Sequence, residues 1–572
     1  MKCVLVGINA KFIHSCLAVY SLKEYAKNCY DIDLSVEEYT INQSEDLILS
    51  EIFKKKPQMI AFSCYIWNYE IIKRLTKNLK KILPNVKIVF GGPEVSFDGK
   101  DILRNIDADF IICGEGEEAF SRLYLALKNN TPLHDVPSLV YKENGEIKET
   151  LRCEPIDMAK LPFVYKDLKR FENRILYYEA QRGCPFNCQY CLSSVDKGVR
   201  FQPIEKVKEE LLIFLQNKVR QVKFVDRTFN ANAKFAMEIW EFLNENDNGI
   251  TNFHFEIASN LITDEMIEFL KTVRSGLFQF EIGVQSTNEK TLSAIDRKGS
   301  FKEIKDTVTK LKENKNIHLH LDLIAGLPFE DFNSFKNSFN DVYSLSPNQF
   351  QLGFLKLLKG SGLKRDAKKY GLVCRDTSPY EVLYTSYLSY GDMLRLKQIE
   401  ELLETYYNSN RFQKAIEYVV SLFKTPFDFF ESFSEFYQEN NEHLRPHSKV
   451  EQYDILYEFS QKIADCDKEY LRWLIKFDLY SHEKAKKLPA WLNEDLNGEY
   501  REEILSFYQK ELENGKLLKE YTDFIPKQVL KMAHIEVFPF NPINKRKIKT
   551  ALLFNYKNVD ILGNATVTEI II

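Results

Sequence analysis

Short apolar runs alternate with amphipathic stretches along the first 135 residues. Apolar runs at residues 3–7, 59–63, 87–90 and 110–113 predict buried strands, and helical spacing at 17–28, 70–83 and 117–129 predicts helices between them. This alternation predicts an α/β fold with an open, doubly wound, Rossmann-like sheet. Ligands of such sheets bind beyond the carboxyl ends of the strands, where this chain has small or Gly-rich segments at 7–10, 63–65, 91–94 and 114–117. A large flat ligand lying close to the backbone and ordinary tight turns both explain these segments.

A second βα rhythm begins after a connector. Residues 137–141 and 146–150 predict a hairpin around Asn144-Gly145, and a stretch with Pro155 and Pro162 leads to the next domain. We then expect strands at residues 177–181, 222–226, 253–258, 278–284, 317–324 and 349–357, with helices between them. Six βα units are two fewer than a closed barrel has, which predicts a partial, open (β/α)6 barrel.

The pattern changes again beyond residue 370. Aromatic-rich helices are expected at residues 381–396, 398–408, 412–422 and 450–465, and strands return at 531–538, 551–555 and 565–571. We interpret the Phe-rich segment 427–436 as part of a hydrophobic core rather than as a binding surface for an apolar substrate. We therefore divide the chain into an amino-terminal α/β domain (1–135), a linker (136–175), a barrel (176–370) and a mainly α-helical extension with terminal strands (371–572).

Charge and cysteine usage narrow the class of protein. The 572 residues carry 78 Lys and Arg against 82 Asp and Glu, and a net charge of −4 gives no reason to expect a nucleic-acid partner. No apolar run approaches the roughly 18 residues of a membrane span, and the apolar start is too short for a signal peptide. We therefore expect a cytoplasmic protein with no membrane contact. The 11 cysteines, an odd number, predict reduced thiols rather than disulfides.

Three cysteines need a different account. Cys184, Cys188 and Cys191 form the motif C-x3-C-x2-C directly after the first expected barrel strand. Thiolates at such spacing bind zinc or an iron–sulfur cluster, but structural zinc wants four ligands and no fourth Cys or His lies nearby in the sequence. Three ligands on a four-iron cluster leave one iron open for chemistry, at the carboxyl-terminal mouth where barrel active sites lie.

On these residues the barrel resembles the radical S-adenosylmethionine (SAM) enzymes, whose signature is C-x3-C-x-aromatic-C, with Tyr190 as the aromatic residue. Segments 224–230, 281–286 and 322–328 resemble the superfamily's motifs on its second, fourth and fifth strands. Gln285, Arg297 and Asp322 are similar, in order and spacing, to the SAM-contacting set of oxygen-independent coproporphyrinogen oxidases.

The resemblance implies a [4Fe–4S] cluster on the three cysteines, with the amino and carboxylate groups of SAM on the fourth iron. It also implies that Tyr190 packs by the adenine of SAM and that Glu256 and Gln285 bond the polar edge of the ligand. Arg297 would bind the carboxylate and Asp322 the ribose hydroxyls. As ordinary residues, the last four would be strand-end or helix-capping polar groups. One electron into the cluster would cleave SAM to methionine and a 5′-deoxyadenosyl radical, which abstracts hydrogen from a substrate.

An α/β domain ahead of such a barrel resembles the cobalamin-binding class of these enzymes, which implies cobalamin as a further cofactor. Its contacts would come from the strand-end segments, through Asn9, His14, Ser63, Gly91, Gly92, Gly114 and Glu115. The Asp-x-His-x-x-Gly loop that supplies a cobalt ligand in other cobalamin proteins is absent, because Phe12 and Leu17 replace its Asp and Gly around His14. We therefore expect His14 either to line the corrin pocket or to cap the next helix. A cobalt without a lower protein ligand would suit methyl transfer to a carbon radical.

The resemblance favours C-methylation of an unknown small-molecule or peptide substrate, with a flavodoxin- or ferredoxin-type electron donor. A non-methylating oxidation, cyclisation or rearrangement is the main alternative. A methylthiotransferase, which would need three more cluster cysteines in the first domain, and a non-catalytic cobalamin or redox sensor are less favoured. The carboxyl-terminal extension resembles that of one cobalamin-type radical SAM subfamily and is either a structural cap or a substrate-selecting wall.

Overall fold

A computed structural model describes residues 1–195, 198–485, 488–521, 523–560 and 562–572. The chain forms two compact units. The first unit contains Met1–Leu319, Ile324–Asp331 and Gly353–Tyr390, and the second contains His320–Leu323, Phe332–Leu352 and Gly391–Ile572. Among the residues described, no helix combines the length and the apolar character that a bilayer crossing requires.

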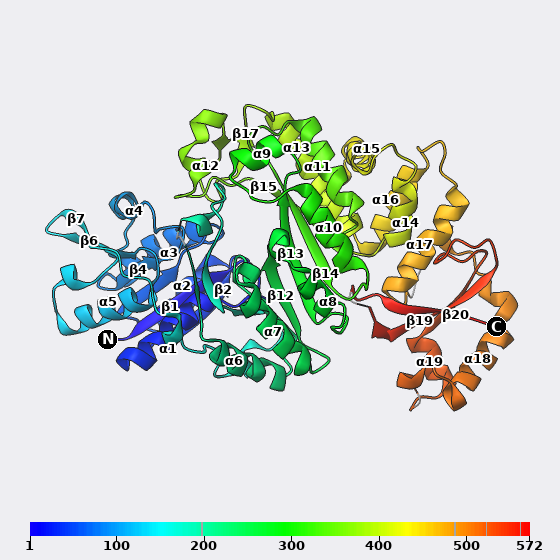
Figure 1. Cartoon of the computed structure of the whole chain (residues 1–572), viewed down its shortest axis with the longest axis horizontal. Coiled ribbons are helices and arrows are strands. Elements are labelled where there is room, and N and C mark those ends of the chain that lie inside the picture. The colour runs from blue at the N-terminus through cyan, green and yellow to red at the C-terminus, as the bar shows by residue number, and fades with distance from the viewer. Residues whose placement is uncertain (196–197, 486–487, 522, 561) are drawn as a thin grey trace. The chain divides into compact units, whose positions relative to one another are not determined.

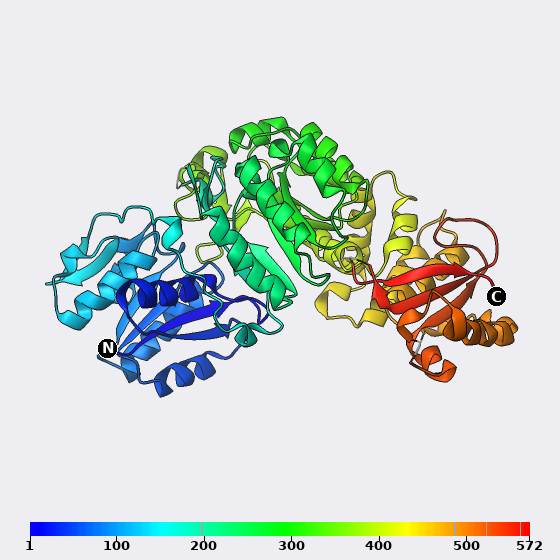
Figure 2. The same cartoon turned by 60° about the horizontal axis from the view of Figure 1, so that its bottom comes forward.

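The first unit begins with a seven-stranded sheet in the order β2-β1-β3-β4-β5-β6-β7 (blue to cyan in Figure 1). Five parallel strands form its main part: β1 (Cys3–Asn9), β2 (Ser35–Thr40), β3 (Met59–Ser63), β4 (Lys87–Gly91) and β5 (Phe110–Ile112). The helices between them are α1 (Leu17–Tyr30), α2 (Glu45–Lys54), α3 (Tyr69–Ile82), α4 (Gly99–Asn105) and α5 (Glu117–Asn129). Strands β1 and β3 are wholly buried, as expected where helices cover both faces of a parallel sheet (Figure 2). The doubly wound α/β fold is thus confirmed.

The hairpin expected in the connector extends this sheet. Strands β6 (Leu139–Glu143) and β7 (Glu146–Glu149) pair antiparallel with each other, and β6 pairs antiparallel with β5. Asn144 and Gly145 both have positive φ, of 51° and 84°, as the two central residues of a tight type I′ hairpin turn require. The hairpin therefore forms the outer edge of the first sheet.

The barrel is an open sheet of six strands in the order β15-β14-β13-β12-β11-β8 (green in Figure 1), which confirms the six-stranded expectation. The strands are β8 (Leu176–Tyr178), β11 (Gln221–Phe224), β12 (Asn252–Ile257), β13 (Phe278–Gln285), β14 (His318–Ala325) and β15 (Gln349–Phe354). Helices α6 (Ile204–Gln216), α7 (Ala233–Glu245), α8 (Asp264–Leu270), α9 (Glu289–Ala294), α10 (Phe301–Lys312) and α11 (Phe332–Ser344) alternate with them. Successive side chains along these strands point to opposite faces of the sheet. One face carries buried phenylalanines, such as Phe255 and Phe280, which pack against Trp240 of α7, and the other face carries polar residues.

The first barrel strand is shorter than expected, and the expectation of one strand over residues 177–181 was wrong. After β8, residues Gln181–Cys184 form β9, which pairs antiparallel with β10 (Gly198–Phe201) in a separate two-stranded sheet. The break occurs where the Ala180 N–H donates to Asp226 at 3.1 Å. The two strands approach closely because Gly183 has φ +103°, and a Cβ there would lie 2.1 Å from the Gly198 carbonyl oxygen. Cys184 therefore lies on a hairpin and not on the loop of a barrel strand.

The expectation of a helix over residues 381–396 was also wrong. Val382–Tyr384 form β17, which pairs antiparallel with β16 (Val373–Cys374), and the helix α13 begins only at Tyr390 and ends at Leu402. The run Val-Leu-Tyr-Thr has β-branched and aromatic side chains, which favour a strand over a helix. A short helix, α12 (Gly362–Arg365), lies between the barrel and this hairpin.

The second unit is mainly helical. A π-helical turn, Leu403–Asn408, follows α13 and leads to α14 (Gln413–Val420), α15 (Pro426–Glu439), α16 (Lys449–Ser460), α17 (Lys468–His482), α18 (Arg501–Asn514) and α19 (Pro526–Met532). Strands β18 (His534–Phe538), β19 (Thr550–Val559) and β20 (Ala565–Ile570) form an antiparallel sheet (red in Figure 1). Phe427, Phe429, Phe430 and Phe433 of α15 are fully buried, so the Phe-rich segment is core.

One buried carboxylate caps a helix from a distance. Asp478 of α17 accepts the backbone N–H groups of Lys414 and Ala415 at 2.9 and 2.8 Å, at the start of α14. Asp478→Ala leaves both buried donors without an acceptor, and we expect it to lower the free energy of unfolding by about 2 kcal/mol. Amide hydrogen exchange of α14 measures this loss of stability. Asp478→Asn keeps one acceptor oxygen and should lower the free energy of unfolding by less. Equal exchange in Asp478→Ala and in a variant at the exposed Asp465 would contradict the assignment.

Candidate functional site

Cys184 is the last residue of β9, and Cys188 and Cys191 lie on the compact turn that follows it. All are free thiols; Cys188 is buried, whereas Cys184 and Cys191 are partly exposed. The Cys191 N–H donates to the Cys188 carbonyl at 3.1 Å, and the Ser194 hydroxyl contacts the carbonyl oxygens of Cys188 and Cys191 at 3.0 and 2.6 Å. These bonds engage backbone polar groups of the turn and do not use the cysteine sulfur atoms.

The turn is also held from outside. The Gln189 N–H donates to the Ile295 carbonyl at 2.9 Å, and the Leu363 N–H donates to the Gln189 carbonyl at 2.8 Å. A Cβ on Gly362 would lie 1.8 Å from the Gln189 side-chain oxygen, so a larger residue at the start of α12 would displace that side chain. Segments about a hundred or more residues apart in the sequence thus fix the middle of the cysteine turn.

Two of the residues expected to contact SAM lie together beside Cys188. Arg297 Nη1 lies 3.8 Å from the Cys188 sulfur, and its Nη2 donates to the Gly283 carbonyl at 2.6 Å. Gln285 has φ 69°, a strained value for a residue other than glycine, and this places its amide 2.3 Å from where a Gly283 Cβ would be. Burial raises the pKa of the Cys188 thiol, and the Arg297 charge opposes that shift. The guanidinium therefore favours the thiolate that a metal cluster needs.

The other two expected SAM contacts lie on strands β12 and β14, which flank β13 in the sheet. Glu256 of β12 pairs with Arg227 at 3.4 Å, and burial raises the pKa of its carboxyl while Arg227 opposes this. Directly across from it on β13, Glu281 binds Lys223 and the His254 ring, both at 3.1 Å. Asp322 lies on β14, next to β13 in the sheet. The polar face of the barrel thus carries alternating acidic and basic groups.

The three thiols are compatible with a cluster rather than with a single ion. Within the described part of the chain, no three His, Cys, Asp or Glu side chains gather as ligands around one ion. Each cysteine of a four-iron cluster binds a different iron, so its sulfurs need not meet around one point. A second polar contact, 3.4 Å from the Cys184 sulfur to the Thr228 hydroxyl, orients the first thiol.

A cavity of about 730 Å³ adjoins this turn. One wall comes from the carboxyl ends of the first sheet's strands, with Ser63, Gly91, Gly92, Gly114 and Glu115, all of which the sequence suggested as cofactor contacts. The other wall comes from the cysteine turn and its hairpin, with Arg182, Gly183, Tyr190, Cys191, Leu192 and Ser193. The same hollow is therefore lined by the strand-end loops and by the cysteine turn.

Close backbone packing shapes the floor of the cavity. Gly92 has φ +106°, and a Cβ there would lie 2.6 Å from the Cys64 carbonyl oxygen, whereas a Cβ on Gly91 would meet nothing within 4 Å. Tyr65 and Trp67, which also line the cavity, stack with ring centroids 4.4 Å apart and planes within 7°. The result is a flat, largely apolar surface beside bare backbone, which suits a large planar ligand.

Asn9 and His14 lie elsewhere and do not line this cavity. The Asn9 amide donates to Glu38 at 2.9 Å and to the His14 carbonyl at 3.1 Å. His14 Nδ1 lies 2.7 Å from the Tyr177 hydroxyl on β8, and burial, with Lys11 and Lys223 nearby, lowers the pKa of its imidazole. The imidazole thus joins the first sheet's loop to the barrel in its neutral form.

Sequence reasoning missed a buried ion pair at the cavity. Glu94, only 3% exposed, pairs with Lys359 at 3.1 Å and accepts a hydrogen bond from the Tyr380 hydroxyl. Lys359 lines the cavity from the segment after the barrel. No motif surrounds Lys359 or Tyr380, and the two lie 265 and 286 residues from Glu94, so the chain alone offered no signal for the pair.

Comparisons with known proteins agree with this layout. Residues 4–124 match the family model described as B12 binding domain, residues 178–342 match the Radical SAM superfamily, and residues 368–554 match a protein of unknown function family, DUF4080.

Curated relatives each match about half of this chain. The chain is 28% identical over 309 residues to an uncharacterized methyltransferase of Pyrococcus horikoshii, covering 50% of this chain and 65% of that protein. It is 29% identical over 262 residues to the anaerobic magnesium-protoporphyrin IX monomethyl ester cyclase of Synechocystis sp., covering 44% and 52%. It is 26% identical over 329 residues to the cobalamin-dependent radical SAM methyltransferase TokK of Streptomyces tokunonensis, covering 52% and 47%. The chain thus spans about half to two thirds of the length of these relatives.

Solved structures share the fold. The cobalamin-dependent SAM radical enzyme OxsB with aqua-cobalamin bound superposes with a TM-score of 0.60 at 16% identity, covering 84% of this chain and 80% of that one. The radical SAM methyltransferase TsrM of Kitasatospora setae, with cobalamin and a [4Fe-4S] cluster bound, gives 0.54 at 13% identity, covering 66% and 76%. The chain therefore contains a B12-binding domain, a Radical SAM superfamily domain and a carboxyl-terminal region that matches the DUF4080 family.

Proposed function

We propose that the chain is a cobalamin-dependent radical SAM enzyme that methylates a carbon atom of its substrate. The observation that carries the proposal is the cavity lined at once by the strand-end loops of the B12-binding domain and by Tyr190 and Cys191 of the cysteine turn. A planar corrin on the glycine wall would face the turn that carries the cluster ligands. The names of TokK, TsrM and the Pyrococcus relative, all methyltransferases, support the same reaction.

The cysteine turn supplies the groups that the cluster and SAM require. Cys184, Cys188 and Cys191 would hold the cluster, and Arg297 beside Cys188 would bind the SAM carboxylate. Gln285 next to Arg297 and Tyr190 in the cavity wall would hold the amino and adenine ends. When bound, the cluster would pass on the electron that cleaves SAM to a 5′-deoxyadenosyl radical, and cobalamin would supply the cobalt that carries the methyl group.

Glu256 and Asp322 would act farther along the strands. Glu256 is the counter-ion of Arg227, which lines the cavity, so its role would be to orient that guanidinium toward the ligand. Asp322 would take the ribose hydroxyls. Among the seven residues suggested for the cobalamin side, the five in the cavity wall are proposed as contacts, whereas Asn9 and His14 would serve the joint between loop and barrel.

Arg297→Met is expected to weaken SAM binding by about 10- to 100-fold, because a charge-assisted bond to the carboxylate is lost. Iron per chain should stay near that of the wild type, because Arg297 is not a cluster ligand. Equilibrium binding of SAM to the reconstituted variants measures this, with the exposed Arg220→Met as the matched control. Unchanged SAM affinity in Arg297→Met would remove Arg297 from the proposed site.

Product analysis tests the reaction type. The anaerobically reconstituted chain, given SAM, hydroxocobalamin and a flavodoxin- or ferredoxin-type reductant, is expected to form both S-adenosylhomocysteine and 5′-deoxyadenosine. The named activity of the Synechocystis relative, a cyclase, favours one alternative, a cobalamin-binding radical enzyme that does not methylate. Formation of 5′-deoxyadenosine without S-adenosylhomocysteine would select that alternative.

A protein named putative methylthiotransferase and two named tRNA-2-methylthio-N(6)-dimethylallyladenosine synthase also match the chain, at 22–24% identity. That activity would need a second cysteine cluster in the first domain. Cys3 starts β1, whereas Cys64 and Cys113 follow the carboxyl ends of β3 and β5, so the parallel sheet puts Cys3 at the opposite edge from the other two. We therefore expect about four irons per reconstituted chain and not about eight.

A further inference from the structure

Two arginines lie side by side on the hairpin that carries the first cluster cysteine. Arg182 of β9 and Arg200 of β10 are directly paired across the two strands. Like charges in such a pair repel, so the arrangement is stable only if both guanidinium groups find carboxylates. Arg182 stands two residues before Cys184, and any shift of its backbone moves that cysteine.

Arg182 finds two carboxylates in forked geometry. Its Nε and Nη2 donate to the two oxygens of Glu179 at 2.9 and 2.8 Å, and its Nη2 also donates to Glu117 at 2.8 Å. Glu117 is the first residue of α5 and is 5% exposed. Burial acts to raise the pKa of the Glu117 carboxyl, but the charge of Arg182 and the hydrogen bonds from Arg182, the Glu117 backbone and Ser21 together lower that pKa. A buried pair this well matched loses most when one partner is removed.

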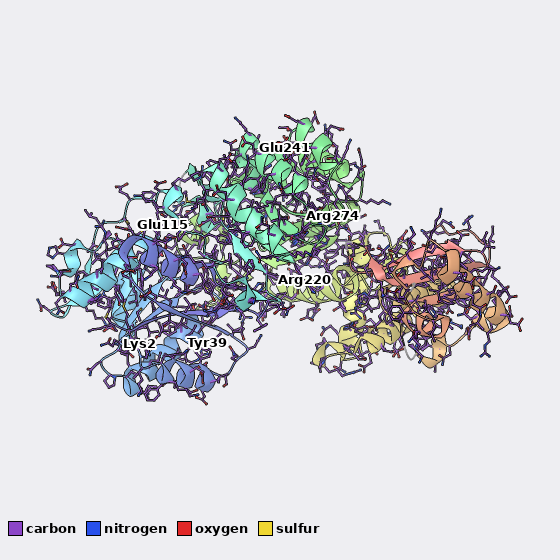
Figure 3. The ribbon with its side chains drawn as sticks, turned by 90° about the horizontal axis from the view of Figure 1, so that it is seen from below. Lys2, Tyr39, Glu115, Arg220, Glu241 and Arg274 are labelled. Carbon is purple, nitrogen blue, oxygen red and sulfur yellow. The ribbon has the colours of Figure 1, made fainter. Side chains whose placement is uncertain are left out.

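Arg200 binds the same acidic loop from the other strand. It pairs with Glu115, which lies in the loop after β5 and is labelled in Figure 3. Arg182 Nη1 reaches Glu115 too, at 3.5 Å. Arg200 Nη1 donates to the Ile156 carbonyl at 2.6 Å, and the Ile156 N–H donates to Glu115 at 2.8 Å. The carboxylate of Glu115 is thus engaged by the hairpin and the connector.

The same residues form the cavity wall. Glu115 and Glu117 line the cavity on the side of the B12-binding domain, and Arg182 and Gly183 line it on the side of the hairpin. Gly183 precedes Cys184, so a ligand in the cavity touches the residue bonded to a cluster ligand. The contact between the two arginines and the acidic loop therefore lies between the two proposed cofactor sites.

We propose that Arg182, with Arg200 beside it, is a positioning residue that couples the cobalamin cavity to the cluster cysteines by docking their hairpin on the Glu115–Glu117 loop. The inference rests on the proposed function, because it needs both cofactors. Loading the cysteines fixes the hairpin, the fixed hairpin holds the acidic loop, and that loop is a wall of the cavity. By thermodynamic reciprocity, a corrin in the cavity strengthens the cluster's hold to the same extent.

Hydroxocobalamin titrations of cluster-loaded and cluster-free forms of the full chain test the coupling. The dissociation constant is read from the corrin spectrum. Cluster-loaded wild type is expected to bind about tenfold more tightly than the cluster-free form. Arg182→Met should bind weakly with the same constant in both forms, while Arg182→Lys, which keeps the charge but not the fork, should retain part of the difference. The control Arg220→Met, well separated from Glu115 in Figure 3, should match the wild type.

The outcomes are separable. A wild-type difference that persists undiminished in Arg182→Met overturns the inference. If Arg182→Met does not retain iron, the titrations are made with Glu117→Gln instead, which keeps a hydrogen-bonding side chain of the same size. An undiminished affinity difference between the cluster-loaded and cluster-free forms of Glu117→Gln also overturns the inference. Equal binding by both wild-type forms overturns the coupling alone, whereas a wild type that binds no hydroxocobalamin overturns the proposed function as well.

Discussion

Replacing Cys184, Cys188 and Cys191 together by alanine is expected to abolish iron binding and SAM cleavage. The three thiols are the only cysteines on the turn next to the cavity, and the turn's backbone bonds do not involve the sulfur atoms. The variant should therefore fold normally and lose the absorbance near ~400 nm that an iron–sulfur cluster gives. Reductive cleavage of SAM should fall by more than about 1,000-fold, because the electron reaches SAM only through the cluster.

Cys29→Ala provides the matched control, since Cys29 is a free, exposed thiol on α1, outside the cavity wall. It should keep wild-type iron and sulfide content and wild-type cleavage. A triple variant that still binds about four irons would show that other residues hold the cluster. That result would remove the basis of the proposed reaction.

The local parts of the site could be predicted, and the distant parts could not. The cysteine motif occupies eight consecutive positions, so its spacing alone revealed the ligands. Arg182 was visible in the same segment, but its partner Glu117 lies 65 residues earlier, and nothing in the sequence connects them. The sequence likewise did not reveal the partners of Glu115. We expected Glu115 as a cofactor contact, but its carboxylate binds Arg200 and the Ile156 amide.

The fold was predicted where periodicity was strong. Most parallel strands of both sheets are short apolar runs between amphipathic helices, and they appear where expected. Strand β2 (Ser35–Thr40) was not expected, because its sequence SVEEYT is not an apolar run. Two other misses have local causes. Gly183 permits a close approach to Gly198 that turns the end of the expected first strand into a separate hairpin, and a run of strand-forming residues at 382–385 delays α13. Such interruptions leave little trace in a periodic pattern.

Gly92→Ala is expected to lower both the stability of the first sheet's edge and the affinity for hydroxocobalamin. At φ +106° an alanine is strained, and its Cβ would lie 2.6 and 3.0 Å from the backbone oxygen and nitrogen of Cys64, which cannot move without disturbing β3. The turn also lines the cavity. We expect the melting temperature to fall, since strain and a backbone clash together exceed about 3 kcal/mol. We expect the dissociation constant to rise by at least about tenfold, because the displaced turn changes the cavity wall.

Gly91→Ala separates the two effects. Its Cβ would meet no atom within 4 Å and its φ is not in the left-handed region, so the melting temperature should not change. Because Gly91 lines the cavity, the added methyl group should still weaken hydroxocobalamin binding, by about tenfold, if the corrin lies against this turn. Gly498→Ala, in equally open space but outside the cavity, is the control for an added methyl group. Wild-type affinity in Gly91→Ala would place the corrin away from the glycine wall and contradict the proposed arrangement, even if Gly92→Ala were unstable.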